Sequence, residues 1–282
     1  MSRAADALQF DSQTPWGTYA PGAWHGLLLR TGHSLGPGLR RLVPALRRPI
    51  KYGVHHAVDV TIWGMRLRLL PRGNMAETKL LFAPQLFDRE ELELLERELQ
   101  PGATFVDIGA NVGAYTYWAH RCLQGRGRIV AVEPDPEMRR RLEFNLHTNG
   151  VNEVDVCPVA LSDAPGFGEL LVNPAQRGQN TLVQGQAQSA GGQRIVQRVE
   201  LDTLVHVLQS RGIDKIDALK IDIEGHEPPV LRHFFEHAPQ SLWPRLAIIE
   251  YMPETVGTIE SLFAVHGYRR GPQTRLNLTF VR

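Results

Sequence analysis

A short apolar run that ends in a carboxylate and a glycine-rich turn places the strongest constraint on this chain. The segment Phe105–Gly113 begins as an apolar run of strand length and ends with glycine, which is typical of a buried parallel strand. Gly109 and Gly113 allow the backbone to turn tightly and to approach a ligand closely. The following residues, Ala114–Leu123, are predicted to form a helix whose free N–H groups face that ligand. The segment therefore predicts a cofactor-binding strand and turn.

The chain from Thr104 onward alternates between strand-like and helical patterns. We predict strands at 104–109, 128–133, 154–159, 217–223 and 245–251, with helices at 113–124, 135–149, 201–211, 227–237 and 255–265. This alternation is typical of a parallel sheet covered by helices on both faces. Two short final strands, 267–270 and 276–281, are expected to form an antiparallel pair at the edge of the sheet.

One insertion interrupts this regular pattern. Two strand-like runs, 169–172 and 194–201, are separated by a polar stretch rich in Gln and Gly. Long loops inside compact domains are often functional, so 177–193 is a candidate lid, with a surface excursion as the alternative.

The first 84 residues are predicted to form a basic extension ahead of a domain at 85–282. Residues 1–72 contain ten Lys or Arg and three Asp or Glu, which gives this segment a formal charge of +7. The whole chain has a formal charge of +1, so the remainder carries −6. A β-hairpin is predicted at 54–70, and a helix capped by Asp88 at 88–99. The apolar runs of the first 50 residues look too broken for long helices, with Pro44 and Pro49 as further interruptions.

Three partners are open for this extension: the main domain, anionic headgroups at a membrane surface, or nucleic acid. Basic and apolar residues alternate around positions 39–48, as in an interfacial segment, whereas aromatic residues are too sparse near the charges to favour nucleic acid. Cys122 and Cys157 show no disulfide or zinc pattern and are expected to be buried thiols. With no apolar run long enough to span a bilayer, a cytoplasmic location is predicted.

The glycine spacing disfavours a dinucleotide as the ligand. Dinucleotide sites use G-x-G-x-x-G, whose middle glycine admits a pyrophosphate to the helix N-terminus. Asn111 occupies that position here, and the Asp107 carboxylate would repel phosphate. A cationic ligand is therefore expected at this turn.

Two further strand ends add to the predicted site. Glu133 ends the second strand, where a carboxylate can accept both hydrogens of a ribose diol. The third strand ends in residues that could flank an adenine, the last of them reaching its exocyclic amine: Ala160, Leu161, Ser162 and Asp163. Together these requirements describe S-adenosylmethionine.

Three segments, in this order, resemble the FkbM family of methyltransferases: Val106–Gly113, Val132–Pro134 and Lys220–Glu227, the last preceded by Leu201–Leu204. The resemblance implies an α/β fold of the Rossmann-like class I methyltransferase type, with a seven-stranded, mostly parallel sheet and an antiparallel last strand. It also implies S-adenosylmethionine as methyl donor and a hydroxyl oxygen as acceptor, often on a sugar.

Carried over by position, the resemblance assigns the binding residues. It places Glu133 at the ribose and 160–163 at the adenine, and it puts four residues at the methionine side of the donor: Asp107, Gly109, Asn111 and Gly113. Asp222 would face the donor's ammonium group or the acceptor. Where this chain has His226, the family commonly has a small residue.

A hydroxyl acceptor requires a base, because it is a poor nucleophile while protonated. Lys220 and Asp222 share one face of their strand, and Glu224 follows at its carboxyl end. We rank Asp222 first as the catalytic base, with Glu224 and His226 behind it, and expect Lys220 to pair with a neighbouring carboxylate. A divalent metal ion on Asp222, Glu224 and Glu227 is an alternative, but nothing requires one and no metal is predicted.

The sequence thus predicts an S-adenosylmethionine-dependent O-methyltransferase that acts on a sugar hydroxyl in a glycan, glycolipid or glycosylated metabolite. A noncatalytic nucleoside-binding or scaffold protein of the same fold is the alternative from another class. A dinucleotide-dependent oxidoreductase is disfavoured by the spacing from Gly109 to Gly113.

Overall fold

A seven-stranded sheet forms the centre of the computed structural model, which describes residues 8–174, 176–178, 180–183 and 195–282. Its strands run in the order β12-β13-β11-β10-β3-β4-β5. The five central strands are parallel, while β13 runs antiparallel to β11 and pairs with β12. The predicted fold and both terminal strands are confirmed, with these bounds: β3 (Thr104–Ile108), β4 (Arg128–Val132), β5 (Val154–Cys157), β10 (Ala218–Ile221), β11 (Leu246–Glu250), β12 (Arg269–Arg270) and β13 (Asn277–Val281).

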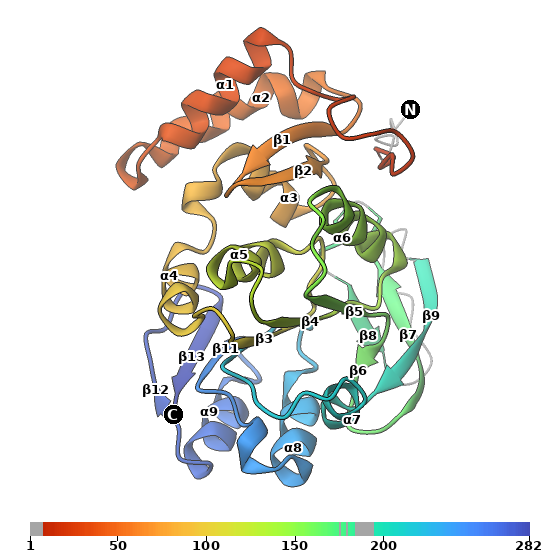
Figure 1. The fold of residues 1–282 in the computed structure, drawn as a ribbon, viewed down its shortest axis with the longest axis vertical. Helices are drawn as coiled ribbons and strands as arrows, with labels where there is room; N and C mark the ends of the chain where they lie inside the picture. Colours follow the sequence, from red (N-terminus) through yellow and green to blue (C-terminus); the bar gives the residue numbers. More distant parts are fainter. Residues whose placement is uncertain (1–7, 175, 179, 184–194) are drawn as a thin grey trace.

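Helices cover both faces of this sheet, as Figure 1 shows. One layer contains α4 (Arg89–Glu98), α5 (Ala114–Leu123) and α6 (Pro136–Thr148), and the other contains α7 (Leu204–Gln209), α8 (Glu227–His237) and α9 (Val256–Val265). Successive residues of β3 join different apolar cores, with Phe105 in the first and Val106 in the second. This alternation follows from the period of two along a strand, and it explains why the central strands are apolar throughout.

Two expected helix starts differ from the structure. The helix predicted from residue 201 begins at Leu204, because 201–202 end strand β9 and the Thr203 hydroxyl caps the helix by accepting from the His206 N–H. Asp88 precedes α4 but does not cap it. Its carboxylate instead binds Lys79 Nζ at 2.9 Å and accepts from the Tyr115 hydroxyl.

The insertion folds into a second, four-stranded sheet beside the first. Its strands, in the order β6-β9-β7-β8, are β6 (Ala160–Leu161), β7 (Gly166–Val172), β8 (Thr181–Val183) and β9 (Ile195–Asp202). The two predicted strand-like runs are therefore confirmed and pair antiparallel as β7 and β9. Most of the candidate lid, residues 184–193, lies outside the described residues.

The N-terminal extension contains more helix than the sequence predicts. The structure contains the predicted hairpin as β1 (Val58–Ile62) and β2 (Met65–Leu69). The first 50 residues, in which no long helix was predicted, contribute to two helices of 12 and 11 residues. Pro44 lies in the first turn of its helix, where a missing N–H costs nothing, and the helix continues past Pro49. The elements are α1 (Ala23–Ser34), η1 (Pro37–Leu42), α2 (Val43–Gly53), α3 (Met75–Phe82) and η2 (Pro84–Leu86), while a further short helix, η3 (Gln240–Leu242), follows α8.

The extension packs on the α5 and α6 side of the domain through one continuous apolar core. Arg68 of β2 is fully buried and forms a two-pronged ion pair with Asp59, at 2.8 and 2.9 Å. Its guanidinium also donates to three backbone carbonyls at positions 11, 14 and 15, and it lies 4.6 Å from the ring centre of Phe144 on α6. Asn145 accepts from the Arg68 N–H. Arg68 thus joins the N-terminal segment, the hairpin and α6.

The remaining sequence-level expectations concern the membrane and the thiols. Among the described residues, no helix has the length and apolar character needed to cross a bilayer. Both cysteines are free thiols; Cys157 is buried as expected, whereas Cys122 is only half-buried. The cytoplasmic location stays a prediction.

Arg68→Ala is expected to lower the free energy of unfolding by about 3–5 kcal/mol, because it leaves Asp59 buried without its cation. Urea unfolding measures this effect. Arg89→Ala is the matched control, because it removes an exposed pair with Glu93 and should cost about 1 kcal/mol or less. Equal losses for the two variants would contradict the role given to Arg68.

Candidate active site

A cavity lies at the carboxyl ends of the parallel strands, where they meet the insertion. The ends of β3, β4 and β10 supply one wall and the insertion supplies the other, as the lining residues show: Ile108, Gly109, Asn111, Val132, Glu133, Pro134, Val159, Ala160, Leu161, Leu170, Arg177, Gly178, Asn180, Leu182, Asp222, Ile223, Glu224 and His226. Most predicted site residues are among them. Asp107, Gly113, Ser162 and Asp163 are not.

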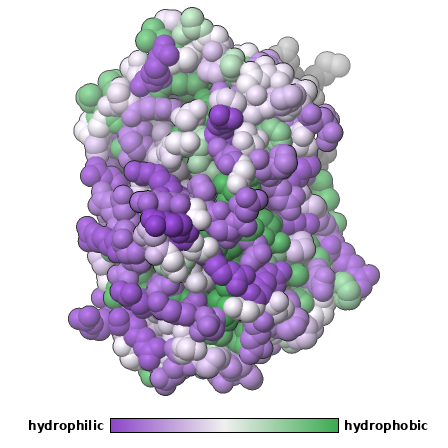
Figure 2. Space-filling view, viewed as in Figure 1, coloured by the Kyte–Doolittle hydropathy of each residue, from purple (hydrophilic) through white to green (hydrophobic). Residues whose placement is uncertain are grey.

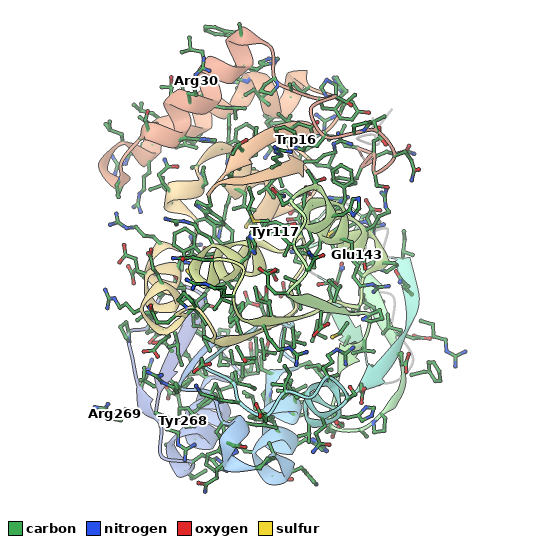
Figure 3. The ribbon with its side chains drawn as sticks, in the orientation of Figure 1. Trp16, Arg30, Tyr117, Glu143, Tyr268 and Arg269 are labelled. Atoms are coloured by element: carbon green, nitrogen blue, oxygen red, sulfur yellow. The ribbon has the colours of Figure 1, made fainter. Side chains whose placement is uncertain are left out.

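The turn after β3 is shaped by contacts within the protein. Gly109 has a φ of +73°, and a Cβ at this position would lie 1.8 Å from the carbonyl oxygen of Asp222. A Cβ on Gly113 would lie 2.4 Å from Leu142 and 2.9 Å from the Tyr117 ring, which packs between α5 and α6 (Figure 3). Both glycines are therefore required by close approaches within the protein, whereas the sequence pattern predicted an approach to a ligand.

Asp107 lies behind this turn. Its side chain is 2% exposed and accepts a 2.6 Å hydrogen bond from the Thr116 hydroxyl. Burial raises the pKa of Asp107 to about 6, against the attraction of Lys220 on the neighbouring strand. Its position supports the turn and does not bring it to the cavity wall.

Glu133 is held at the cavity by two backbone donors. Its carboxylate accepts from the N–H groups of Asn111 and Asp135, both at 2.8 Å. Burial raises the pKa of Glu133 to about 7, and the backbone hydrogen bonds oppose that shift. Each oxygen keeps a free lone pair. The side chain can therefore accept further hydrogen bonds from a bound diol.

The insertion closes over the same region. Arg177 contacts Asp135 Oδ1 at 3.1 Å, and Asn180 donates to Asp135 Oδ2 at 2.9 Å. From the other side, Asn74 at the start of α3 donates to Asn111 Oδ1 at 2.7 Å. The insertion is thus attached to the start of α6, and the extension is attached to the turn after β3.

The strand end predicted for an adenine divides into two parts. Ala160 and Leu161 line the cavity as β6. Ser162 is buried beside it, where its hydroxyl donates to Asp163 Oδ1 and lies 3.4 Å from His226 Nε2. Asp163 is exposed beyond the cavity wall.

Three carboxyl groups gather beyond the end of β10, and two of them, Asp222 and Glu224, line the cavity. Oxygens of Asp222, Glu224 and Glu250 lie within 4.8 Å of one another. Lys220 Nζ lies 3.4 Å from Asp222 Oδ2, as expected for an ion pair. The sequence predicted Glu227 as the third member of this group, but Glu250 takes that place. The Glu227 side chain instead turns back and accepts from the N–H groups of Ile223 and Gly225.

The pKa values of these three carboxyl groups differ, because a single ammonium group, that of Lys220, lies beside them. Burial opposes ionisation of Asp222, but Lys220 outweighs it and holds the pKa of Asp222 below its ordinary value. Burial and then Asp222 raise the pKa of Glu250 to about 10. Burial, followed by repulsion from Asp222 and Glu227, raises the pKa of Glu224 to about 7. Glu224 also has a φ of +53°, a costly conformation for this residue type.

Sequence reasoning missed two residues of this region. Glu250 ends a buried parallel strand, which is the same signal that identified Glu133. Asn74 carries no comparable pattern, since it reaches Asn111 only through the packing of α3.

The sheet order and the cavity at its carboxyl edge define a class I methyltransferase. A family model described as the methyltransferase FkbM domain matches residues 107–270, more than half of the chain. The chain belongs to this family, and its methyl donor is S-adenosylmethionine.

Three curated relatives show how far the similarity extends. The chain is 28% identical over 205 residues to 31-O-demethyl-FK506 methyltransferase FkbM of Streptomyces tacrolimicus, covering 61% of this chain and 74% of the relative. Methyltransferase sdnD of Sordaria araneosa is 29% identical, over 45% of this chain and 58% of its own length. AMB antimetabolite synthetase AmbE of Pseudomonas aeruginosa is also 29% identical, over 54% of this chain but 8% of its own length.

One similar solved structure is methyltransferase FkbM from Methylobacillus flagellatus. The match has a TM-score of 0.44 at 15% identity, and it covers 88% of this chain and 60% of the chain of that structure.

Gly109→Ala is expected to destabilise the protein more than Gly125→Ala does. Gly125 has a similar φ of +69° but open space around it, so its replacement costs only the conformational strain of about 1–2 kcal/mol. Gly109→Ala adds a clash with the Asp222 carbonyl and should also abolish donor binding. Urea unfolding and calorimetry with S-adenosylmethionine measure both effects, and equal behaviour of the two variants would refute the assigned contact.

Donor affinity is expected to fall as the pH drops below about 7. Burial raises the pKa of Glu133, so protonation in this range removes the carboxylate that is predicted to accept from the ribose. The donor affinity should then fall by up to about tenfold per pH unit. Calorimetry should show a weaker dependence for Glu133→Gln, whose side chain does not titrate. The difference between the two profiles isolates Glu133 from the other groups, and identical profiles would contradict this assignment.

Proposed function

We propose that this protein transfers a methyl group to a hydroxyl oxygen of a small-molecule or glycan acceptor. The hydroxyl belongs to a sugar, and the acceptor is a glycan, a glycolipid or a glycosylated metabolite. The observation that carries the proposal is Glu224, a carboxyl group at the cavity wall with a pKa of about 7. A hydroxyl acceptor needs a base, and a base works best when its pKa is near the operating pH. The Streptomyces relative is named for 31-O-demethyl-FK506, which also supports oxygen as the acceptor atom. The sugar is suggested by the family resemblance.

The cavity residues fit the donor. Glu133 would hold the ribose, Asn111 and Gly109 the methionine side, and the apolar wall of Ala160 and Leu161 the adenine, with Ser162 and Asp163 at its edge. When bound, S-adenosylmethionine supplies an electrophilic methyl group on a cationic sulfur. The ionised Asp222 adds a favourable negative charge on the same side of the cavity.

We propose Glu224 as the base in place of Asp222. Lys220 keeps Asp222 ionised with a lowered pKa, and a carboxylate of low pKa accepts a proton poorly. Glu224 in its ionised form would take the hydroxyl proton as the acceptor oxygen bonds to carbon. Burial lowers the pKa of His226, so its neutral ring is a second acceptor on the same wall.

The relative weight of the base follows from typical magnitudes. Correct alignment of reactants corresponds to roughly 7–11 kcal/mol of the barrier, whereas a general base contributes about 10²- to 10⁴-fold in rate. The rigid strand ends therefore account for more of the proposed catalysis than proton transfer does. The membrane-surface contact predicted for the extension is a separate proposal, supported by the basic and apolar side chains that α1 and α2 expose.

The function is tested by incubating a host extract with methyl-labelled S-adenosylmethionine, with and without the protein, and identifying the labelled species. We expect label on an oxygen of a glycosylated molecule. Label on nitrogen or carbon would refute the O-methyltransferase proposal. Donor binding without any transfer would favour the noncatalytic alternative.

Glu224→Gln should lower kcat on the labelled acceptor by about 10²- to 10⁴-fold at unchanged donor affinity, because it removes the base and keeps the side-chain shape. Single-turnover kinetics and calorimetry measure the two quantities. Glu143→Gln is the control, because Glu143 is exposed on α6, where Figure 3 labels it. This variant should change neither kcat nor donor affinity. If Asp222→Asn abolishes transfer while Glu224→Gln does not, Asp222 is the base, as the sequence pattern predicts.

A further inference from the structure

The helical part of the extension, α1-η1-α2, is firmly attached along its inner side. Leu29, Val43 and Ile50 are buried in the main core. A Cβ on Gly32 would lie 2.8 Å from the carbonyl oxygen of Phe82, so α1 passes close to the end of α3. Gln85 donates to two carbonyls at the end of α1, both at 2.8 Å. The element is therefore a fixed part of the fold.

Its outer side exposes large apolar side chains. Of the eleven that the described residues expose, five come from this short element: Trp24 (62% exposed), Leu27 (49%), Leu39 (53%), Leu42 (50%) and Tyr52 (62%). Single exposed leucines are ordinary on proteins, whereas five large exposed apolar side chains on one short element favour an interaction site.

The charges between these side chains all have one sign. Residues 12–58 contain no Asp or Glu and six Lys or Arg. Arg30, Arg40, Arg41 and Arg48 are exposed, and none of them forms an ion pair within the described part of the chain. Arg47 and Arg48 lie around a surface hollow with Pro44 and Tyr52.

This element also occupies one end of the molecule. In Figure 1, α1 and α2 stand at one end of the longest axis, and in Figure 3 Arg30 lies far from Arg269 at the other. Figure 2 shows apolar and polar residues side by side at that end. Since residues 73–282 have a formal charge of −6, a negatively charged surface would attract this end and repel the remainder. The charge distribution therefore orients the molecule.

We propose that the outer side of α1-η1-α2 docks on an anionic lipid bilayer. The arginines contact phosphate headgroups, and Trp24, Leu27, Leu39, Leu42 and Tyr52 enter the headgroup and acyl boundary, as in interfacial helices. Charge complementarity identifies this occupant. Single-stranded nucleic acid stacks on flat aromatic side chains beside the charges, whereas three of the five apolar side chains here are leucines. A duplex would contact the arginines alone and leave these apolar side chains exposed. The inference is independent of the acceptor proposed above.

The test is sedimentation of the full chain with vesicles of phosphatidylcholine and phosphatidylglycerol, and with phosphatidylcholine alone. We expect binding to the anionic vesicles that weakens as salt is raised. Arg40→Gln combined with Arg41→Gln should weaken the affinity by about 10- to 30-fold, because each basic residue near an anionic surface contributes a factor of about three to five. Leu39→Ser combined with Leu42→Ser should weaken it as well, even at low salt.

Two matched double variants serve as controls. Arg269→Gln with Arg275→Gln removes two exposed arginines elsewhere, and Phe167→Ser with Val265→Ser removes two exposed apolar side chains outside the element. Both should bind like the wild type, and unfolding midpoints verify that all variants fold. Equal binding to both kinds of vesicle, equal loss in test and control variants, or preference for single-stranded RNA over anionic vesicles at the same salt would overturn the proposal.

Discussion

The contact between the backbones of Gly109 and Asp222 determines the shape of the site. A side chain at position 109 would occupy the place of the Asp222 carbonyl oxygen, so the ends of β3 and β10 meet only because residue 109 is glycine. The Asp222 N–H also donates to the Ile108 carbonyl, which continues the ladder between these strands. On the other side, β4 brings Glu133 beneath the same turn. Glu133 after β4 and the carboxylates after β10 therefore face one cavity from the two sides of β3.

Burial of these carboxylates explains how chemically identical groups acquire different protonation. Asp222 lies beside Lys220 and stays ionised, whereas Glu250 and Glu224 share its negative field without an equal partner. Glu133 is stabilised by backbone N–H groups, which only partly offset its burial. The cavity thus combines a fixed anion with carboxyl groups that titrate near neutral pH. This combination suits binding of a cationic donor next to a proton acceptor.

Particular residues show why some of the fold and site could be predicted and some could not. Strand ends such as Glu133 and Asp222 stand out because a carboxylate directly after a buried apolar run is costly to bury unless it binds a partner. The α1 and α2 helices were missed because their apolar residues pack on a hairpin and α3 that local patterns do not place beside them. Asp88 was assigned as a cap from its position alone, but Lys79 and Tyr115 compete for its carboxylate.

The sequence by itself determined the order of the seven strands of the main sheet and of the helices between them, the family, the donor and the carboxylates at the ends of three strands. The element order and the carboxylates follow from local periodicity, while the family follows from the resemblance carried by three short segments. Only the tertiary structure decided that Glu250 joins Asp222 while Glu227 turns away, and that Gly109 and Gly113 accommodate protein atoms. The same holds for the exposed side of α1 and α2. The reason is physical: pKa values, close approaches and exposure depend on neighbours that are distant in sequence.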